Sequence, residues 1–91
     1  MQDKLVLVVE DEGSIRDMVK FALERASFRV STSGNAADAR MCLADERPDL
    51  ILMDWMMPGV SGIELARELK NNATTRDIPL IMLTARAEEE D

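Results

Sequence analysis

The 91-residue sequence has no histidine and only one cysteine, Cys42. These two residue types supply most ligands of protein-bound zinc and copper, so a site for either metal is not expected. A single cysteine also cannot form an internal disulfide, which fits a reducing compartment such as the cytoplasm. We interpret Cys42 as a small apolar side chain on a helix.

The sequence also lacks long apolar runs and an excess of basic residues. No apolar stretch approaches the roughly 20 residues that span a bilayer. The first four residues pass directly into a short strand, so we expect no signal peptide, no membrane association and a cytoplasmic location. The net charge is -7, and the 11 Lys and Arg residues are scattered along the chain. Direct nucleic-acid binding by this chain is therefore not expected, because such binding depends on neutralising phosphates.

Short apolar runs alternate with longer segments of helical period, which is typical of βαβ units. Strands are predicted at residues 4–9, 28–32, 49–53 and 80–83, with helices beginning at Ser14, running from 36 to about 46, and following Ser61. Right-handed crossovers place the first strand centrally, the second on one side, and the third and fourth on the other. The expected fold is a single α/β domain over residues 1–91, a doubly wound parallel sheet with strand order 2-1-3-4.

Three helix starts carry capping signals. Ser14 with Asp17 and Ser61 with Glu64 both fit a capping box, and Asn35 can cap the second helix. Helical spacing then predicts which side chains face the core. In the first helix these are Ile15, Met18, Val19, Ala22, Leu23 and Ala26, and in the third they are Ile63, Ala66 and Leu69.

Acidic and hydroxyl side chains follow three of the predicted strands. Glu10 and Asp11 come after the first strand, Asp54 after the third and Thr84 after the fourth. In an open parallel α/β sheet, ligands bind outside the carboxyl ends of the strands, so these four residues are expected to converge. Three carboxylates that close together repel one another, and Mg²⁺ resolves this because it prefers oxygen ligands. The pattern predicts a site for a hard cation and a phosphoryl group.

Such a site allows more than one function. Asp54 could act as a nucleophile toward phosphorus, with Thr84 donating its hydroxyl to a phosphoryl oxygen. An aspartate-nucleophile phosphatase of the haloacid dehalogenase type would want a second Asp where Met56 stands. A flavin- or nucleotide-binding domain would want a Gly- or Ser/Thr-rich loop in place of Glu10 to Gly13. Taken singly, Asp54 is equally consistent with a helix-initiating or turn residue after a strand. Thr84 could also serve as a helix N-cap, alone or in addition to its role at the site.

Taken together, these residues resemble the receiver domain of two-component response regulators. The resemblance rests on Glu10-Asp11, on Asp54 to Gly59 with Ser61-Gly62, and on Thr84-Ala85, and it covers essentially the whole chain. Residues 54–56, 75–79 and 82–86 look most like the OmpR/PhoB subfamily, of the PhoB type.

The resemblance implies a flavodoxin-like fold, a histidine kinase as partner, and a role for each residue of the site. Asp54 would be the phosphoacceptor, Asp11 a direct Mg²⁺ ligand, Glu10 a ligand acting through water, the Met56 carbonyl a further ligand, and Thr84 the switch hydroxyl. The chain would be a signalling domain with at most autophosphatase activity rather than an enzyme, and within its full protein would control transcription.

Receivers continue beyond the fourth strand through a helix, a strand that carries an essential lysine, and a last helix. We therefore expect a truncated receiver without that helix-strand-helix and without an effector domain. Lys4, Lys20 and Lys70 are not expected to replace the lysine. The fourth strand would be an apolar edge, which favours a homodimer, and strand exchange is one way to form it. The alternative is a fragment that cannot be phosphorylated and acts only in binding or dimerisation.

Overall fold

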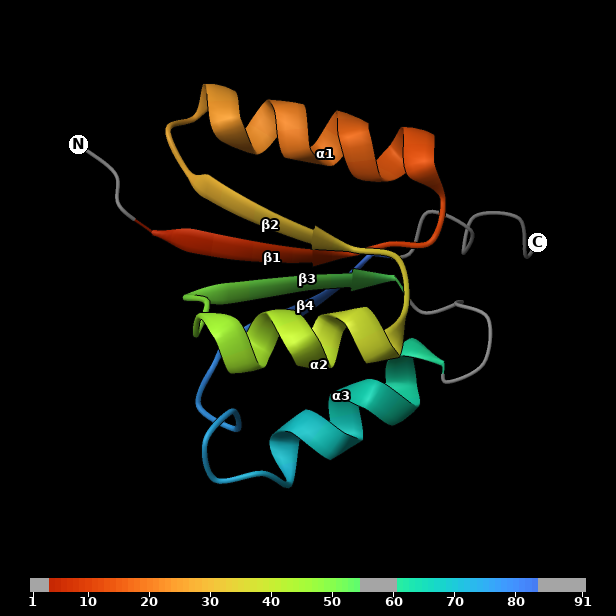
Figure 1. Ribbon diagram of the computed structural model, residues 1–91, viewed down its shortest axis with the longest axis vertical. Helices are drawn as coiled ribbons and strands as arrows, with labels where there is room; N and C mark the ends of the chain where they lie inside the picture. The colour runs from red at the N-terminus through yellow and green to blue at the C-terminus, as the bar shows by residue number, and fades with distance from the viewer. Residues whose placement is uncertain (1–3, 55–60, 84–91) are drawn as a thin grey trace.

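The computed structural model describes residues 4–54 and 61–83. Its seven elements in chain order are β1 (Leu5–Val9), α1 (Gly13–Arg25), β2 (Arg29–Ser33), α2 (Ala36–Asp45), β3 (Leu50–Asp54), α3 (Gly62–Lys70) and β4 (Leu80–Leu83). All strand pairs are parallel, and their order is β2-β1-β3-β4. Helix α1 lies on one face of the sheet, while α2 and α3 lie on the other (Figure 1). The predicted fold class and strand order are confirmed.

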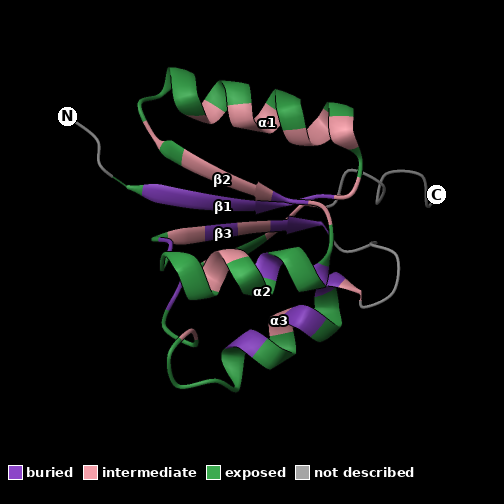
Figure 2. Ribbon diagram, viewed as in Figure 1, coloured by how far each residue is buried: buried purple, intermediate pink, exposed green. Residues whose placement is uncertain are grey.

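The core lies mainly between the sheet and helices α2 and α3. All five residues of the central strand β1 are buried, as its continuous apolar run predicts (Figure 2). Alternate residues of β1 and β3 then pack against the two helices. This core comprises Leu7, Val9, Ala36, Ala39, Ile51, Met53, Leu65, Leu69 and Ile78. No helix in the described ranges is long and apolar enough to cross a membrane.

Helix α1 differs from its prediction at both its start and its core face. The helix begins at Gly13 after Glu12, which makes no side-chain capping bond, so the expected box of Ser14 and Asp17 is wrong. Ser14 instead donates its hydroxyl to the Glu12 carboxylate at 3.3 Å. The predicted core face was too wide, because α1 is the single described helix on its face of the sheet and has no buried residue. Its half-buried apolar residues are Ile15, Val19 and Leu23, whereas Met18, Ala22 and Ala26 are exposed.

The caps of α2 and α3 are confirmed. The Asn35 side chain accepts a hydrogen bond from the Asp38 backbone N–H, and Ser61 with Glu64 forms both bonds of a capping box. The predicted core face of α3 is partly wrong. Leu65 and Leu69 are buried, whereas Ile63 is 45% exposed. Leu65 and Leu69 are four residues apart, so they lie about one turn apart on the same face of α3, the face toward the sheet.

Strand boundaries match the predicted ones to within one residue. Strand β2 begins at Arg29, and β3 includes Asp54 as its last residue. Asp49, predicted as the first residue of that strand, instead precedes it. Its carboxylate accepts a hydrogen bond from the Leu5 backbone N–H at 2.8 Å, which joins β1 to the start of β3. This contact lies at the amino ends of the strands, at the opposite end from Glu10, Asp11 and Asp54.

Candidate functional site

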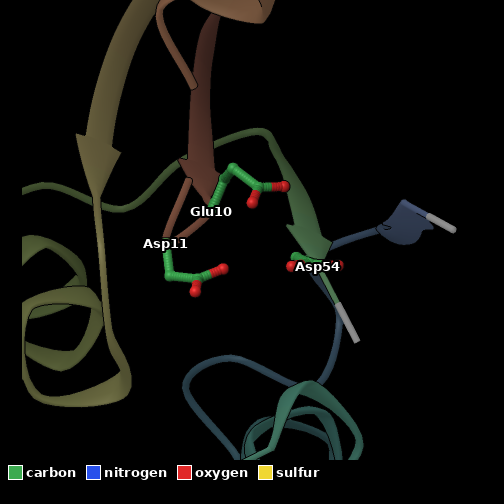
Figure 3. A group of neighbouring side chains, drawn as sticks. All are labelled: Glu10, Asp11 and Asp54. Atoms are coloured by element: carbon green, nitrogen blue, oxygen red, sulfur yellow. The ribbon is translucent and has the colours of Figure 1, made fainter. Parts of the chain in front are cut away.

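Three acidic side chains meet at the carboxyl ends of β1 and β3 (Figure 3). Glu10 and Asp11 follow β1, and Asp54 ends β3. One carboxylate oxygen from each lies within 4.8 Å of the others. Glu10 and Asp54 are 1% and 2% exposed, and Asp11 is half-buried. The structure therefore brings together three of the four residues that the sequence placed at this edge.

The sheet register explains this convergence. Val9 of β1 pairs with Met53 of β3, so the residue that follows each lies next to the other across the two strand ends. The apolar residues of both strands fix this register, because a shift of one residue would expose the core face of β3. The register therefore brings Glu10 and Asp54, which are far apart in the sequence, next to each other at one edge of the sheet.

The backbone of Glu10 is held on both sides. Its N–H donates to the Ser33 carbonyl at 3.0 Å, and its carbonyl accepts from the Arg16 guanidinium at 2.8 Å. Its carboxylate accepts from the Glu12 backbone N–H at 3.0 Å. Sequence reasoning missed Arg16, whose only signal was a basic residue placed early in a helix that follows an acidic loop.

Burial and like charges act together on Glu10. Burial raises the pKa of its carboxyl above the usual range, the Glu12 N–H opposes this, and the nearby Asp54 and Asp11 charges raise the pKa further. Asp11 Oδ1 is buried and has no hydrogen-bond partner among the described residues. A buried carboxylate oxygen without a donor is costly unless a cation or another donor reaches it.

The residues fit a hard divalent cation. The three carboxylates offer only oxygen ligands, which suits Mg²⁺. Two oxygens bound directly to the same Mg²⁺ lie about 3 to 4 Å apart, given metal–oxygen distances near 2.1 Å. A set of oxygens within 4.8 Å is compatible with one direct ligand and another acting through water.

Two predicted site residues, Met56 and Thr84, lie outside the described residues. The strand before Thr84 is described, and its last residue, Leu83, pairs with Asp54. Lys70 is engaged elsewhere, since its ammonium donates to the carbonyls of Arg76 and Ile78. This agrees with the expectation that Lys70 does not serve the acidic site.

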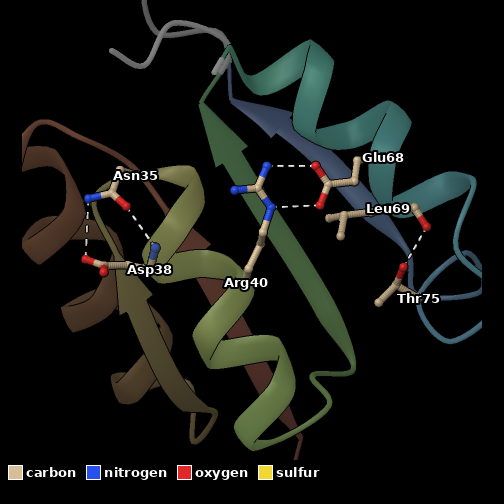
Figure 4. Close-up of polar contacts among 6 residues, drawn as sticks. All are labelled: Asn35, Asp38, Arg40, Glu68, Leu69 and Thr75. Atoms are coloured by element: carbon tan, nitrogen blue, oxygen red, sulfur yellow. Dashed lines mark hydrogen bonds and ion pairs between the residues drawn. The ribbon is translucent and has the colours of Figure 1, made fainter. Parts of the chain in front are cut away.

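Other polar contacts stabilise the helices away from this site (Figure 4). Arg40 of α2 forms a two-bond ion pair with Glu68 of α3, with both distances at 2.8 Å. The Thr75 hydroxyl donates to the Leu69 carbonyl at 2.6 Å near the end of α3. The Arg40 and Glu68 side chains are nearly half exposed, and we interpret their pair as a link between two helices.

Comparison with known sequences gives one family. Residues 6–91 match the response regulator receiver domain. The chain is 50% identical over 91 residues to the phosphate regulon transcriptional regulatory protein PhoB of Pseudomonas aeruginosa, covering all of this chain and 40% of that protein. It is 52% identical over 86 residues to PhoB of Escherichia coli, covering 94% of this chain and 38% of that protein. The chain thus spans about 40% of the length of these relatives.

Solved structures agree with the sequence match. The N-terminal domain of a response regulator receiver protein from Methanoculleus marisnigri superposes with a TM-score of 0.88 at 37% identity, covering 91% of this chain and 68% of that one. The response regulator TrrA from Thermotoga maritima, solved in complex with Mg²⁺ and BeF, gives a TM-score of 0.84 at 33% identity. That match covers 96% of this chain and 74% of TrrA.

Proposed function

Because this chain belongs to the response regulator receiver domain family, we propose that Asp54 accepts a phosphoryl group from a histidine kinase with Mg²⁺ bound beside it. The observation that carries the proposal is the cluster of Asp54 with Glu10 and Asp11 at the carboxyl ends of the strands. Two observations support the binding of a cation here. Asp11 Oδ1 is buried without a hydrogen-bond partner among the described residues, and the chain is similar to TrrA, which was solved in complex with Mg²⁺ and BeF.

The chemistry follows from the placement of Asp54. A carboxylate oxygen of Asp54 attacks phosphorus, and the new P–O bond forms as the P–N bond to the donor imidazole breaks. The released imidazole nitrogen takes up a proton. A cation held by Asp54, Asp11 and Glu10 would offset the negative charge of the phosphoryl oxygens. Strand β3 holds the nucleophile at its end, so the transfer depends mostly on position and charge neutralisation.

The remaining roles are assigned by family resemblance. Asp11 would hold Mg²⁺ directly, Glu10 would act through water and the Met56 carbonyl would be a further ligand. The Thr84 hydroxyl donates to a phosphoryl oxygen of the modified Asp54. Phosphorylation adds about -1.5 to -2 units of charge, which draws that hydroxyl inward and changes the surface around β4.

The partners follow from the same family. The phosphodonor is a histidine kinase, and the printed names of the relatives, transcriptional regulatory proteins, support a role of the longer protein in transcription control. A second copy of the chain is a further partner. Strand β4 is paired with β3 alone within the described part of the chain, and an edge of this kind can pair with another chain.

The direct test is phosphorylation with a small-molecule phosphodonor in the presence of Mg²⁺. Intact mass should show one added phosphoryl group on the native chain, and hydroxylamine should remove it because an acyl phosphate is labile. The Asp54→Asn variant should show none. Asp45→Asn is the matched control, since Asp45 is exposed at the end of α2.

Two outcomes would contradict the proposal. An adduct that persists in Asp54→Asn would place the acceptor elsewhere. An unmodified native chain would mean that this chain does not complete the phosphoacceptor site. A titration with Mg²⁺ in the same samples then tells whether the cation site is present without phosphoryl transfer.

A further inference from the structure

The Arg16 guanidinium lies between the loop after β1 and the loop after β2. One terminal nitrogen, Nη1, donates to the Glu10 carbonyl at 2.8 Å. The same nitrogen lies 3.2 Å from the place that a Cβ at Gly34 would occupy. The other, Nη2, lies 3.6 Å from the corresponding place at Gly13. Arg16 therefore packs closely over the backbone of one loop while it holds the other.

The carbonyl that Arg16 binds belongs to the peptide between the two acidic residues that follow β1. The orientation of this peptide determines where the Asp11 side chain points relative to Glu10. The Glu10 N–H is held separately by the Ser33 carbonyl of β2. Arg16 fixes the carbonyl side of Glu10 with a charged donor, and bonds of this type are about twice as strong as neutral ones.

We propose that Arg16 is a positioning residue for the cation site, and that position 34 is glycine because the guanidinium needs the space there. The proposal rests on the proposed Mg²⁺ binding. It gives the β2–α2 loop, which contains Gly34, an indirect effect on cation affinity, although this loop supplies none of the three clustered carboxylates. Partners that orient metal ligands are often worth 10- to 100-fold in metal affinity.

A purely electrostatic role of Arg16 and a positioning role predict opposite changes in Mg²⁺ affinity when the side chain is removed. Removing a positive charge near a cation site should tighten cation binding, since like charges repel. Removing a group that orients the ligands should weaken binding. The sign of the change in Mg²⁺ affinity therefore separates a positioning role from a purely electrostatic one.

The experiment measures the Mg²⁺ dissociation constant by calorimetry for the native chain and for Arg16→Met, Arg16→Lys, Gly34→Ala and the Arg16→Met/Gly34→Ala double variant. We expect Arg16→Met to weaken binding about tenfold. Arg16→Lys should recover most of this loss, because lysine keeps the positive charge and its ammonium can donate to the Glu10 carbonyl. Circular dichroism in EDTA identifies the variants that remain folded.

The two glycine variants test the space around the guanidinium. A methyl group at position 34 would lie 3.2 Å from Nη1, a tight contact, so the guanidinium would have to move by a few tenths of an ångström. If Arg16 positions the Glu10 carbonyl as proposed, this shift should weaken Mg²⁺ binding in Gly34→Ala. The same substitution should add little once Arg16 is Met. Gly13→Ala is the matched control, since 3.6 Å is an ordinary contact. Arg25→Met, at the far end of α1, controls for the loss of one positive charge and should leave affinity unchanged or slightly tighter.

The outcomes distinguish this proposal from the proposed function. A native chain that binds no Mg²⁺ would overturn both. Binding in the native chain with equal or tighter binding in Arg16→Met would overturn the positioning role alone. If Arg16→Met does not fold, Arg16→Lys and Gly34→Ala still decide, because full affinity in Gly34→Ala would contradict the proposed need for space.

Discussion

Ser27 has a backbone conformation that residues other than glycine rarely adopt. Its φ of 74° places it in the left-handed region at the end of α1. The Ser27 N–H donates to the Glu24 carbonyl and the Phe28 N–H to the Leu23 carbonyl, both at 3.0 Å, which is a Schellman motif. Glycine is preferred at this position because it has no Cβ.

Ser27→Gly is therefore expected to stabilise the protein by about 0.5 to 1 kcal/mol. Urea denaturation measures the free energy of unfolding. Ser14→Gly is the control, because Ser14 lies within α1, where glycine has a lower helix propensity than serine and should not stabilise the protein. Loss of stability in both variants would show that the left-handed conformation of Ser27 carries no cost.

Glu10 links stability to pH in the absence of cation. Its folded-state pKa is raised, mainly by burial, so the folded protein binds the proton more readily than the unfolded chain. Stability from this group is greatest below the ordinary carboxyl pKa and decreases as pH rises through the raised value. At neutral pH in EDTA, Glu10→Gln should be more stable than the native chain, and the difference should shrink as the pH is lowered toward 4.

Urea denaturation at neutral and acidic pH checks this expectation. Glu24→Gln is the control, because Glu24 is exposed on α1 and should show no such difference. Added Mg²⁺ should stabilise the native chain by mass action. A Glu10→Gln variant less stable than the native chain at neutral pH would contradict the unfavourable burial of the charge.

Single residues of the site were predictable from the sequence to different degrees. Glu10, Asp11 and Asp54 were predictable because each follows or ends an apolar strand. Arg16 was not, because its partner is a backbone carbonyl that leaves no pattern in the sequence. That Asp11 Oδ1 is buried without a partner among the described residues was not predictable either, since it depends on how the loop after β1 folds.

At the level of elements, the start of α3 depends on its capping box. Ser61 accepts from the Glu64 N–H, and Glu64 accepts from the Ser61 N–H, each at 3.2 Å. Ser61→Ala should cost about 1 kcal/mol of stability, because one helical N–H loses its partner. Chemical denaturation measures this. Ser14→Ala is the control and should change little, since Ser14 caps no backbone N–H.

The caps of α2 and α3 were predictable because a cap is a local pattern of a few residues. The faces of α1 and α3 were less so, because helical spacing shows that apolar residues share a stripe but does not show how much of it a neighbour covers. Met18 and Ile63 belong to such stripes and are 63% and 45% exposed. Only the placement of each helix on the sheet decides which part of its stripe is buried.

For the whole molecule, the order of the strands was predicted from the right-handedness of the crossovers. Interactions between copies of the chain do not follow in this way. Ile81 of β4 is 52% exposed on the last described strand of the sheet. An apolar edge strand is a site for pairing with a second chain.

We expect sedimentation velocity to show association that increases with concentration, and Ile81→Lys to reduce it because a charge on an edge strand opposes pairing. Met41→Lys is the control, since Met41 is 70% exposed on α2 and away from this edge. A single monomeric species of the native chain at every concentration would contradict pairing through β4.

The contrast between β1 and α1 has a consequence for motion. Every residue of β1 is buried, whereas α1 has no buried residue. We expect amide protons of such a strand to exchange with solvent mainly when the whole domain unfolds, and those of a loosely packed helix to exchange also through brief local opening. Glu10 and Asp11 join the two segments. We therefore expect the acidic cluster to lie at the boundary between a strand that exchanges slowly and a helix that exchanges faster.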